Sequence, residues 1–263
     1  MKLTKRSVEK VWGRRILPRP FARELTEPVG EIWFEPSAQH DELLIKYLFT
    51  SEKLSVQTHP ADNQAGEGVR GKDECWLVLD AEPGASLAIG FREEISSEAM
   101  RAAALDGSIE DLLEWHAVKA GDFFYLPANT VHAIGPGLSL IEVQQNTDIT
   151  YRLYDYGRPR ELHLEDGMRV ASGLPYADPR QRNVAPTEAC CLVEGPYFRL
   201  DHCVGAPDIA TLEAHGEGLL VLPISGEVYV SGEAVVAGEC AEASDAASID
   251  FSAAGRTLLA SPR

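Results

Sequence analysis

Three separated segments of the chain carry side chains that could bind one metal ion together. Gln57 and His59 stand two residues apart, Glu74 follows 15 residues after His59, and His132 comes later still. Side chains two residues apart on a β-strand point to the same face, so Gln57 and His59 would face one cavity. Two imidazoles, a carboxylate and an amide oxygen form a ligand set that zinc accepts, with a coordination position left for a substrate. The pattern favours a metal site that is open to substrate.

The ligand types alone do not identify the metal, because manganese, iron, cobalt and nickel accept the same donors. Taken singly, each residue would more often be structural: a hydrogen-bonded histidine, an exposed acid at a strand end, or a polar strand residue. The order of the elements favours a metal site. Gln-x-His is followed by Glu74 and then by Gly-x5-Pro-x4-His, which runs from Gly121 to His132.

The elements that must position these residues read as strands. Short stretches rich in β-branched and aromatic residues recur between Gly, Pro, Asn and Asp, which is typical of a sandwich or a closed barrel. The stretches are Leu43–Phe49, Leu54–Gln57, Cys75–Leu79, Ser86–Ile89, Phe123–Leu126 and Leu138–Gln144.

One interlude, at about residues 95–116, is predicted to be helical. Ser96–Leu105 is rich in helix-forming residues, and Asp106-Gly107 should end that helix. Ser108–Trp115 should form a second helix, with Ser108 as its N-cap.

The character of the sequence changes from about residue 165. Strand-like pieces are expected at Tyr197–Val204, Gly218–Ile224, Glu227–Val230 and Arg256–Ala260, with a hairpin between Gly226 and Gly232. The segment Gly232–Ala254 is dominated by small and acidic residues, so its strands should be weak. We interpret this part as a second, smaller β-unit after a boundary near 155–170.

Composition restricts the partners. The net charge of −17 argues against nucleic acid and anionic membranes, since both need a positive protein surface. No apolar run approaches the roughly 20 residues that cross a bilayer, and the basic start of the chain lacks the apolar core of a secretory signal. Five cysteines without a CxxC pair fit a reduced, cytoplasmic compartment. We expect a monomer or a small homo-oligomer.

With these segments in their order, the sequence resembles a type I mannose-6-phosphate isomerase (phosphomannose isomerase) of the short bacterial form, in the cupin superfamily. The resemblance covers residues 1 to about 160 in the family's order. The matching segments are Val11-Trp-Gly13, Leu44-Ile-Lys46, Leu54-Ser-Val-Gln-Thr-His-Pro60, Lys72-Asp-Glu-Cys-Trp76, Val131-His-Ala-Ile134, Ile141-Glu-Val-Gln-Gln145 and Thr150-Tyr-Arg-Leu-Tyr-Asp-Tyr-Gly-Arg158.

The resemblance implies a mainly β fold: a cupin jelly-roll barrel with a small helical insert and a second, smaller β-barrel-like unit at the C-terminus. We expect a metal-binding catalytic domain at 1–165 and a degenerate cupin-like domain without metal ligands at 166–263. The second part lacks another QxH or HxH, so a second metal there is not expected. The implied function is a zinc-dependent, cytosolic aldose–ketose isomerase of carbohydrate metabolism, with one zinc ion per chain.

Carried over by position, the resemblance implies a role for nine residues. The implied metal ligands are Gln57, His59, Glu74 and His132, and the implied active-site arginine is Arg152. The implied substrate and phosphate positions are Lys46, Ser55, Lys72 and Arg158. Glu142 is our first candidate for the base that moves the proton, with Asp148 and Lys72 as alternatives.

The reasons for Glu142 and Lys46 come from their positions. Glu142 has the parity of His132 if both belong to one extended strand, so both would face the lumen. Lys46 lies in an apolar strand, where an unpaired ammonium would be costly. A charged ligand or an internal salt bridge would equally explain it.

Three rival functions remain open. The same site could act on another sugar phosphate such as glucose-6-phosphate, or the protein could be a non-catalytic sugar-binding cupin. A metal-dependent oxygenase is third, because Gln57 and the cluster of cations fit it poorly. The tryptophans are expected to pack in the core or at the rim. The histidines outside the metal set are expected to be surface or capping residues, namely His40, His116, His163, His202 and His215.

Overall fold

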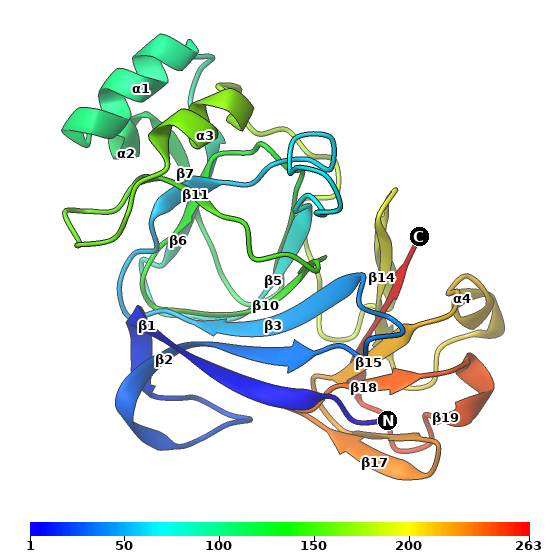
Figure 1. Ribbon diagram of the computed structural model, residues 1–263. Helices are drawn as coiled ribbons and strands as arrows, with labels where there is room; N and C mark the ends of the chain where they lie inside the picture. Colours follow the sequence, from blue (N-terminus) through cyan, green and yellow to red (C-terminus); the bar gives the residue numbers. More distant parts are fainter.

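The computed structural model describes all 263 residues, and the chain folds mainly into β-strands (Figure 1). The N-terminal part contains β1 (Thr4–Ile16), β2 (Glu24–Glu35), β3 (Leu43–Phe49), β4 (Val56–Thr58), β5 (Glu74–Ala81), β6 (Ser86–Phe91), β7 (Leu113–Ala117), β8 (Asp122–Leu126), β9 (His132–Ile134), β10 (Leu138–Gln145), β11 (Tyr151–Tyr154) and β12 (Arg182–Asn183). These strands form two sheets. The first has the order β1-β2-β3-β10-β5-β8-β12 and the second β11-β4-β9-β6-β7.

The two sheets face each other across a shared core. Trp76 and Leu140 of the seven-stranded sheet belong to the same buried cluster as Leu87 and Ile134 of the five-stranded sheet. Side chains alternate between the two faces of a strand, so polar residues two positions from these apolar ones also point into the lumen. The lumen between the sheets therefore holds both apolar and polar side chains.

The central strands β3 and β10 of the seven-stranded sheet are buried on both faces. In β10, Leu140 points into the lumen, whereas Ile141 and Val143 belong to a second cluster shared with the C-terminal strands. This double burial explains why Leu43–Phe49 is apolar at almost every position rather than alternating. Lys46 is the one charged residue of that strand.

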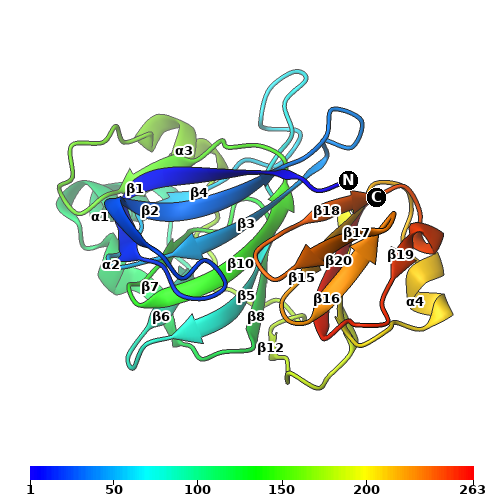
Figure 2. The same ribbon diagram turned by 90° about the horizontal axis from the view of Figure 1, so that it is seen from below.

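The helices cover the outer face of the five-stranded sheet. They are α1 (Ser97–Asp106), α2 (Ile109–Leu112) and α3 (Leu164–Val170), and they lie on the side of the barrel away from the C-terminal strands (Figures 1 and 2). Met100 of α1 and Ile109 of α2 pack in one cluster with Ala88 and Ala133 of that sheet. None of the helices in the structure has the length and apolar character needed to cross a membrane.

The C-terminal part contains β13 (Cys190–Glu194), β14 (Phe198–Val204), α4 (Ile209–Glu213), β15 (Leu219–Pro223), β16 (Glu227–Val230), β17 (Glu233–Val236), β18 (Ala241–Ala243), a 3-10 turn (Ala246–Ser248), β19 (Ile249–Asp250) and β20 (Arg256–Pro262). They form sheets of order β13-β14-β20-β15-β18 and β17-β16-β19. Figure 2 shows these strands beside β8 and β12 of the first barrel. The expected fold class, mainly β with a helical insert and a second β-unit, is confirmed.

Several details differ from the sequence predictions. Ser108 stands at the N-cap position of α2, as expected, but its side chain makes no capping hydrogen bond: its hydroxyl donates to Asp106 (Oγ–Oδ1 2.6 Å), and only Ile109–Leu112 is helical. The following residues form β7 because Trp115 pairs with Ala88 of β6, which supplies a partner strand. By contrast, Gly107 ends α1 in the left-handed region (φ 87°), as expected.

The long strands β1 and β2 were not anticipated, and they supply one edge of the seven-stranded sheet. That sheet also extends as far as Asn183, through β12, whereas the predicted domain boundary lay at 165/166. The position of the boundary remains a prediction.

Candidate metal centre and active site

The predicted metal ligands converge inside the lumen. Gln57 on β4 lies directly opposite His132 at the start of β9, and Glu74 begins β5 in the facing sheet. The carboxylate of Glu74 lies 3.4 Å from His132 Nε2 and 3.6 Å from His59 Nε2. The ligand atoms of His59, Glu74 and His132 all lie within 4.8 Å of one another, and all three residues are buried. Three segments far apart in the sequence thus supply one compact set of donors.

Backbone carbonyls fix the orientation of both imidazoles. Nδ1 of His59 lies 2.7 Å from the carbonyl oxygen of Ile149, and Nδ1 of His132 lies 2.9 Å from that of Thr130. A carbonyl only accepts, so each Nδ1 carries the proton and each Nε2 presents its lone pair to the lumen. This is the usual arrangement of metal-binding histidines, in which a hydrogen bond at one nitrogen orients the other.

Burial also keeps the two imidazoles neutral. It lowers the pKa of His132 to about 4 and that of His59 well below its ordinary value, and the nearby Lys72 ammonium acts in the same direction on both. A neutral imidazole is the form that binds a metal.

Glu74 has one oxygen without a partner. Its Oε2 accepts from Lys72, but its buried Oε1 has no hydrogen-bond donor. Buried polar atoms are seldom left in this state unless an ion or a water binds them. Burial raises the pKa of Glu74 to about 7, although the Lys72 ammonium opposes that change. Two imidazole lone pairs that face the lumen and an unpaired carboxylate oxygen fit a divalent cation.

Gln57 completes the set through its amide. Its Nε2 lies 3.2 Å from His132 Nε2, and its Oε1 accepts from the Ser55 hydroxyl (3.0 Å). A half-turn of the amide exchanges the two atoms, after which Oε1 faces the imidazoles and Nε2 can donate to Ser55. Ser55 therefore contacts the proposed ligand Gln57 and also lines the cavity.

A row of side chains crosses the seven-stranded sheet next to these ligands. Lys46 lies directly opposite Glu142, which lies directly opposite Trp76. The Lys46 ammonium is 3.2 Å from Glu142 Oε1 and 2.5 Å from Gln144 Oε1, and the Trp76 indole donates to Glu142 Oε2 (3.0 Å). An internal salt bridge thus accounts for Lys46 in its apolar strand.

Glu142 is held as a carboxylate. Burial acts to raise its pKa, but the ammonium groups of Lys72 and Lys46 outweigh it and hold the pKa at about 2. Lys72 lies 3.6 Å from Glu142 Oε1 and 3.4 Å from His59 Nε2, and it also pairs with Glu74. Glu142 and His132 lie on different strands, β10 and β9, whereas the sequence predicted one extended strand for both. The turn at Gly135–Gly137 sends β10 into the opposite sheet, and both residues still face the lumen.

A cavity of about 410 Å³ opens beside the ligand set. Five of the six Lys and Arg side chains that line it are paired with carboxylates. The pairs are Arg6–Glu35, Lys10–Glu31, Lys46–Glu142, Lys72–Glu74 and Arg160–Asp155.

Arg152 is the exception. Its Nε donates to the carbonyl of Glu161 (2.9 Å), and it pairs with no carboxylate. Burial and the neighbouring Arg160 charge lower the pKa of Arg152 below its ordinary value. An arginine nevertheless stays charged in proteins, so Arg152 supplies an unbalanced positive charge to the cavity. An anionic ligand would balance it.

Searches against known proteins give a consistent result. No family model matches the chain. Over 234 residues it is 36% identical to the mannose-6-phosphate isomerase of Streptococcus mutans, an alignment that spans 72% of this chain and 74% of that protein. It is 37% identical to the mannose-6-phosphate isomerase ManA of Bacillus subtilis, over 70% of this chain and 62% of that one.

The chain belongs to the mannose-6-phosphate isomerase family. Its fold matches the crystal structure of the Bacillus subtilis mannose-6-phosphate isomerase with a TM-score of 0.74 at 24% identity, covering 98% of both chains. A zinc-bound mannose 6-phosphate isomerase matches with a TM-score of 0.66 at 14% identity, over 100% of this chain and 99% of that one. The predicted cupin-type fold and the predicted family are confirmed.

One predicted phosphate-binding residue of this family member lies away from the cavity. Arg158 pairs with Asp155 (2.7 Å) and donates to the carbonyl of Lys53 (2.8 Å), and it does not line the cavity. Arg160, which was not predicted, lines it instead. Asp148, the alternative proton carrier, also lies in the cavity wall.

The wall formed by β1 and β2 was missed altogether. Trp33 lies between two cations, 4.3 Å from the Arg6 guanidinium and 4.5 Å from the Lys46 ammonium, measured to the ring centroid. Its indole donates to Glu31 (2.5 Å), which also pairs with Lys10 (3.2 Å). Arg6, Val8, Lys10 and Trp12 recur at every second position and line the cavity, and that alternation was the available signal.

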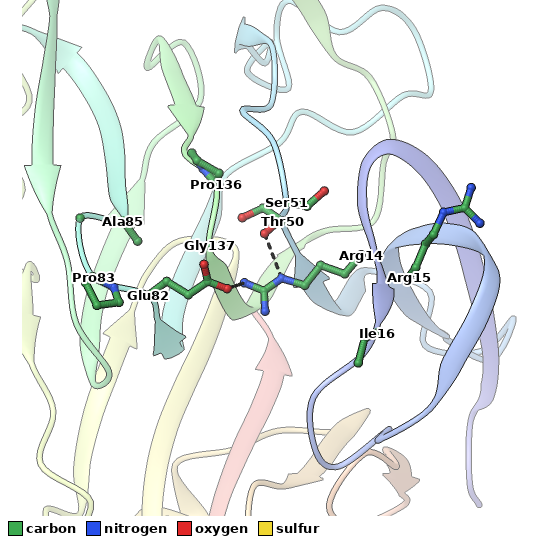
Figure 3. A pocket seen from close by; sticks show the side chains of 11 residues that line it. Arg14, Arg15, Ile16, Thr50, Ser51, Glu82, Pro83, Ala85, Pro136 and Gly137 are labelled. Atoms are coloured by element: carbon green, nitrogen blue, oxygen red, sulfur yellow. Dashed lines mark hydrogen bonds and ion pairs between the residues drawn. The ribbon is translucent and has the colours of Figure 1, made fainter.

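A larger cavity, of about 630 Å³, lies just past the C-terminal end of β5 (Figure 3). Glu74 is at the other end of that strand. Arg14 spans it, donating to the carbonyl of Thr50 (2.9 Å) and lying 3.1 Å from Glu82. Its lining contains no histidine or cysteine, and its one acidic residue already pairs with Arg14. Of the four predicted ligands, Gln57 lines the smaller cavity and none lines the larger one.

Proposed function

We propose that this protein is a zinc-dependent isomerase that interconverts mannose-6-phosphate and fructose-6-phosphate through an enediol(ate). The observation that carries the proposal is the buried set of His59, Glu74 and His132, with the half-buried Gln57 next to it at the cavity wall and the carboxylate of Glu142 nearby. The named relatives act on mannose-6-phosphate, and one structural neighbour binds zinc. We assign Gln57 Oε1, Glu74 and the two imidazole Nε2 atoms as the ligands of a single zinc ion.

The reaction moves a carbonyl between C1 and C2 of the open-chain sugar. A proton must leave the carbon next to the carbonyl, and negative charge develops on an oxygen. Bound zinc would act as a Lewis acid that stabilises this charge, which is worth several kcal/mol in such sites.

Glu142 is the proposed base. Its carboxylate is ionised, lines the cavity and is oriented by hydrogen bonds from Lys46 and Trp76. A positioned carboxylate can take the proton from C2 of mannose-6-phosphate and return it to C1, and the reverse reaction uses the opposite order. The two ammonium groups beside it keep it ionised between turnovers.

Lys72 and Arg152 are the proposed cationic partners of the substrate oxygens. The charges of Glu142 and Glu74 raise the pKa of Lys72 above its ordinary value despite its burial, so it acts as an ammonium donor. Arg152 is charged without a carboxylate partner, so it can bind the developing oxyanion or the phosphate. Lys46 and Ser55 line the same cavity, and Ser55 orients the amide of Gln57.

We propose a supporting role for the C-terminal unit. Phe198 and Leu200 of β14 pack with Leu77 of β5 and Ile141 of β10, so this unit covers the back of the sheet that holds Glu142 and Glu74.

The five cysteines are free, as expected in a reducing compartment such as the cytoplasm.

Elemental analysis combined with a coupled assay tests the proposal. The purified protein should contain close to one zinc per chain and convert mannose-6-phosphate to fructose-6-phosphate. Glucose-6-phosphate, assayed separately, should be turned over far more slowly. Bound zinc without turnover of either sugar would favour a non-catalytic sugar-binding protein. Preferential turnover of glucose-6-phosphate would reject our choice of substrate.

A further inference from the structure

His163 is a member of the cavity wall that the reaction described above does not use. It stands at the N-cap position of α3, but its side chain makes no capping hydrogen bond there. It turns instead toward β11, where its Nδ1 accepts from the backbone N–H of Arg152 (3.2 Å). Its own backbone N–H donates to the carbonyl of Arg152 (2.8 Å). These two bonds hold the imidazole along the free edge of β11.

The bond at Nδ1 assigns the tautomer of His163. A backbone N–H can only donate, so Nδ1 must present a lone pair to it. In the neutral imidazole the proton then sits on Nε2. This is the opposite of the tautomer of the two metal-binding histidines, whose Nδ1 atoms donate to carbonyls. His163 lines the cavity and therefore offers it a hydrogen-bond donor and no acceptor.

The position of His163 follows from the strand register. Arg152 lies directly opposite Gln57, and Gln57 lies directly opposite His132. His163 flanks Arg152 on the other side, so the order across the sheet is His132, Gln57, Arg152, His163. Neighbouring strands are about 4.8 Å apart, which places the backbone of His163 about 10 Å from that of Gln57.

We propose that the Nε2–H of His163 donates a hydrogen bond to the phosphate group of the substrate. The inference rests on the proposed function, which places C1 and C2 at the ligand set. The phosphate at C6 then lies several bonds farther along the row, past Arg152. A phosphate oxygen accepts hydrogen bonds strongly, and Arg152 offers it a positive charge that no carboxylate balances.

Two amide substitutions separate this contact from the support of Arg152. In His163→Asn, the side-chain oxygen takes the place of Nδ1 and can accept from Arg152, but nothing occupies the position of Nε2. In His163→Gln, an amide N–H reaches the position of Nε2, and the acceptor for Arg152 is lost. A role confined to positioning Arg152 would therefore impair His163→Gln more than His163→Asn.

Steady-state kinetics with mannose-6-phosphate and inhibition by inorganic phosphate are the measurements. We expect His163→Asn to raise KM and the phosphate inhibition constant about tenfold or more, with kcat within a few-fold of wild type. His163→Gln should recover most of the phosphate affinity. His40→Asn is the matched control and should leave both constants unchanged, because His40 contacts Glu242 away from the cavity.

Imidazole ¹⁵N signals of the wild-type, zinc-loaded protein provide a test that does not depend on the variants folding. We expect His163 to carry its proton on Nε2, and the Nε2–H signal to move when inorganic phosphate is added. A proton on Nδ1 would overturn the proposal. So would a folded His163→Asn variant whose KM and phosphate inhibition constant match the wild type. A wild-type protein that does not isomerise mannose-6-phosphate would instead reject the proposed function, while the response of the ¹⁵N signal to phosphate would still judge His163.

Discussion

Gln57 and His132 lie directly opposite each other on β4 and β9, and this is the pairing that joins the first and third metal-binding segments. Their side-chain nitrogens are 3.2 Å apart. The pairing also places Arg152 next to Gln57 on the other side, through β11. One line across a sheet therefore brings two proposed ligands and the unpaired cation together, and the first prediction concerns this line.

Replacing His132 should remove the metal. His132→Ala deletes one of two imidazole donors, and we expect the purified variant to contain far less than one zinc per chain and to lose isomerase activity. Inductively coupled plasma analysis measures the metal. His116→Ala, which removes a histidine outside the cavity, is the control and should retain zinc. Full zinc content in His132→Ala would show that the ligand set is misassigned.

Arg152 and Arg158 should respond differently to the same substitution. Arg152→Ala removes the unpaired charge from the cavity, and we expect kcat/KM to fall by about 100-fold or more with zinc content and thermal stability near wild type. Arg158→Ala should leave kcat/KM within a few-fold and lower the melting temperature, because Arg158 pairs with Asp155 outside the cavity. Equal losses of activity in the two variants would contradict this distinction.

Glu142→Gln should abolish proton transfer while keeping the shape of the side chain. We expect kcat to fall by about 100- to 10,000-fold, the usual contribution of a positioned base. The diagnostic measurement is exchange of the sugar's C–H hydrogen with deuterated solvent, followed by NMR of the sugar phosphate. Exchange should stop in the variant. Wild-type exchange in Glu142→Gln would assign the base to another group, such as Asp148.

Trp33 should position Lys46 through its ring. Trp33→Leu removes the aromatic face that the ammonium contacts, a contact worth about 0.5–2 kcal/mol, and we expect a several-fold loss in kcat/KM. Trp33→Phe, which keeps an aromatic face, should recover much of it. Trp115→Leu breaks a similar contact to Lys53 outside the cavity and serves as the control. No difference between Trp33→Leu and Trp33→Phe would show that the ring face is unimportant.

The placement of Gln57, His59 and Glu74 toward the lumen could be predicted from the sequence because its information is local. The two-residue spacing of Gln57 and His59, and the position of Glu74 at a strand start, depend only on the period of a strand. Glu142 faces the lumen, as predicted, but it does not share a strand with His132. The chain turns between them at Gly135–Gly137, and β10 belongs to the opposite sheet.

The wall formed by β1 and β2 could not be recognised with the same ease. Most of the N-terminal half of β1 is exposed at the edge of the sheet, so its residues are polar on both faces and lack the usual apolar alternation. Arg6 and Lys10 acquire their place in the cavity only by pairing with β2, which in turn pairs with β3. Such register depends on contacts between segments distant in sequence.

By itself the sequence determined which residue types are available for metal binding and proton transfer, and which face of its own strand each occupies. The tertiary structure decided which charges are balanced. Lys46 pairs with Glu142, and Lys72 pairs with Glu74. Arg152 is the one cation of the cavity lining that pairs with no carboxylate. It also decided that Arg158 lies outside the cavity lining and that His163 lies in it. Periodicity fixes the direction of a side chain from its own strand, whereas its charge partner and hydrogen-bond partner come from segments that only the folded chain brings within about 3 Å.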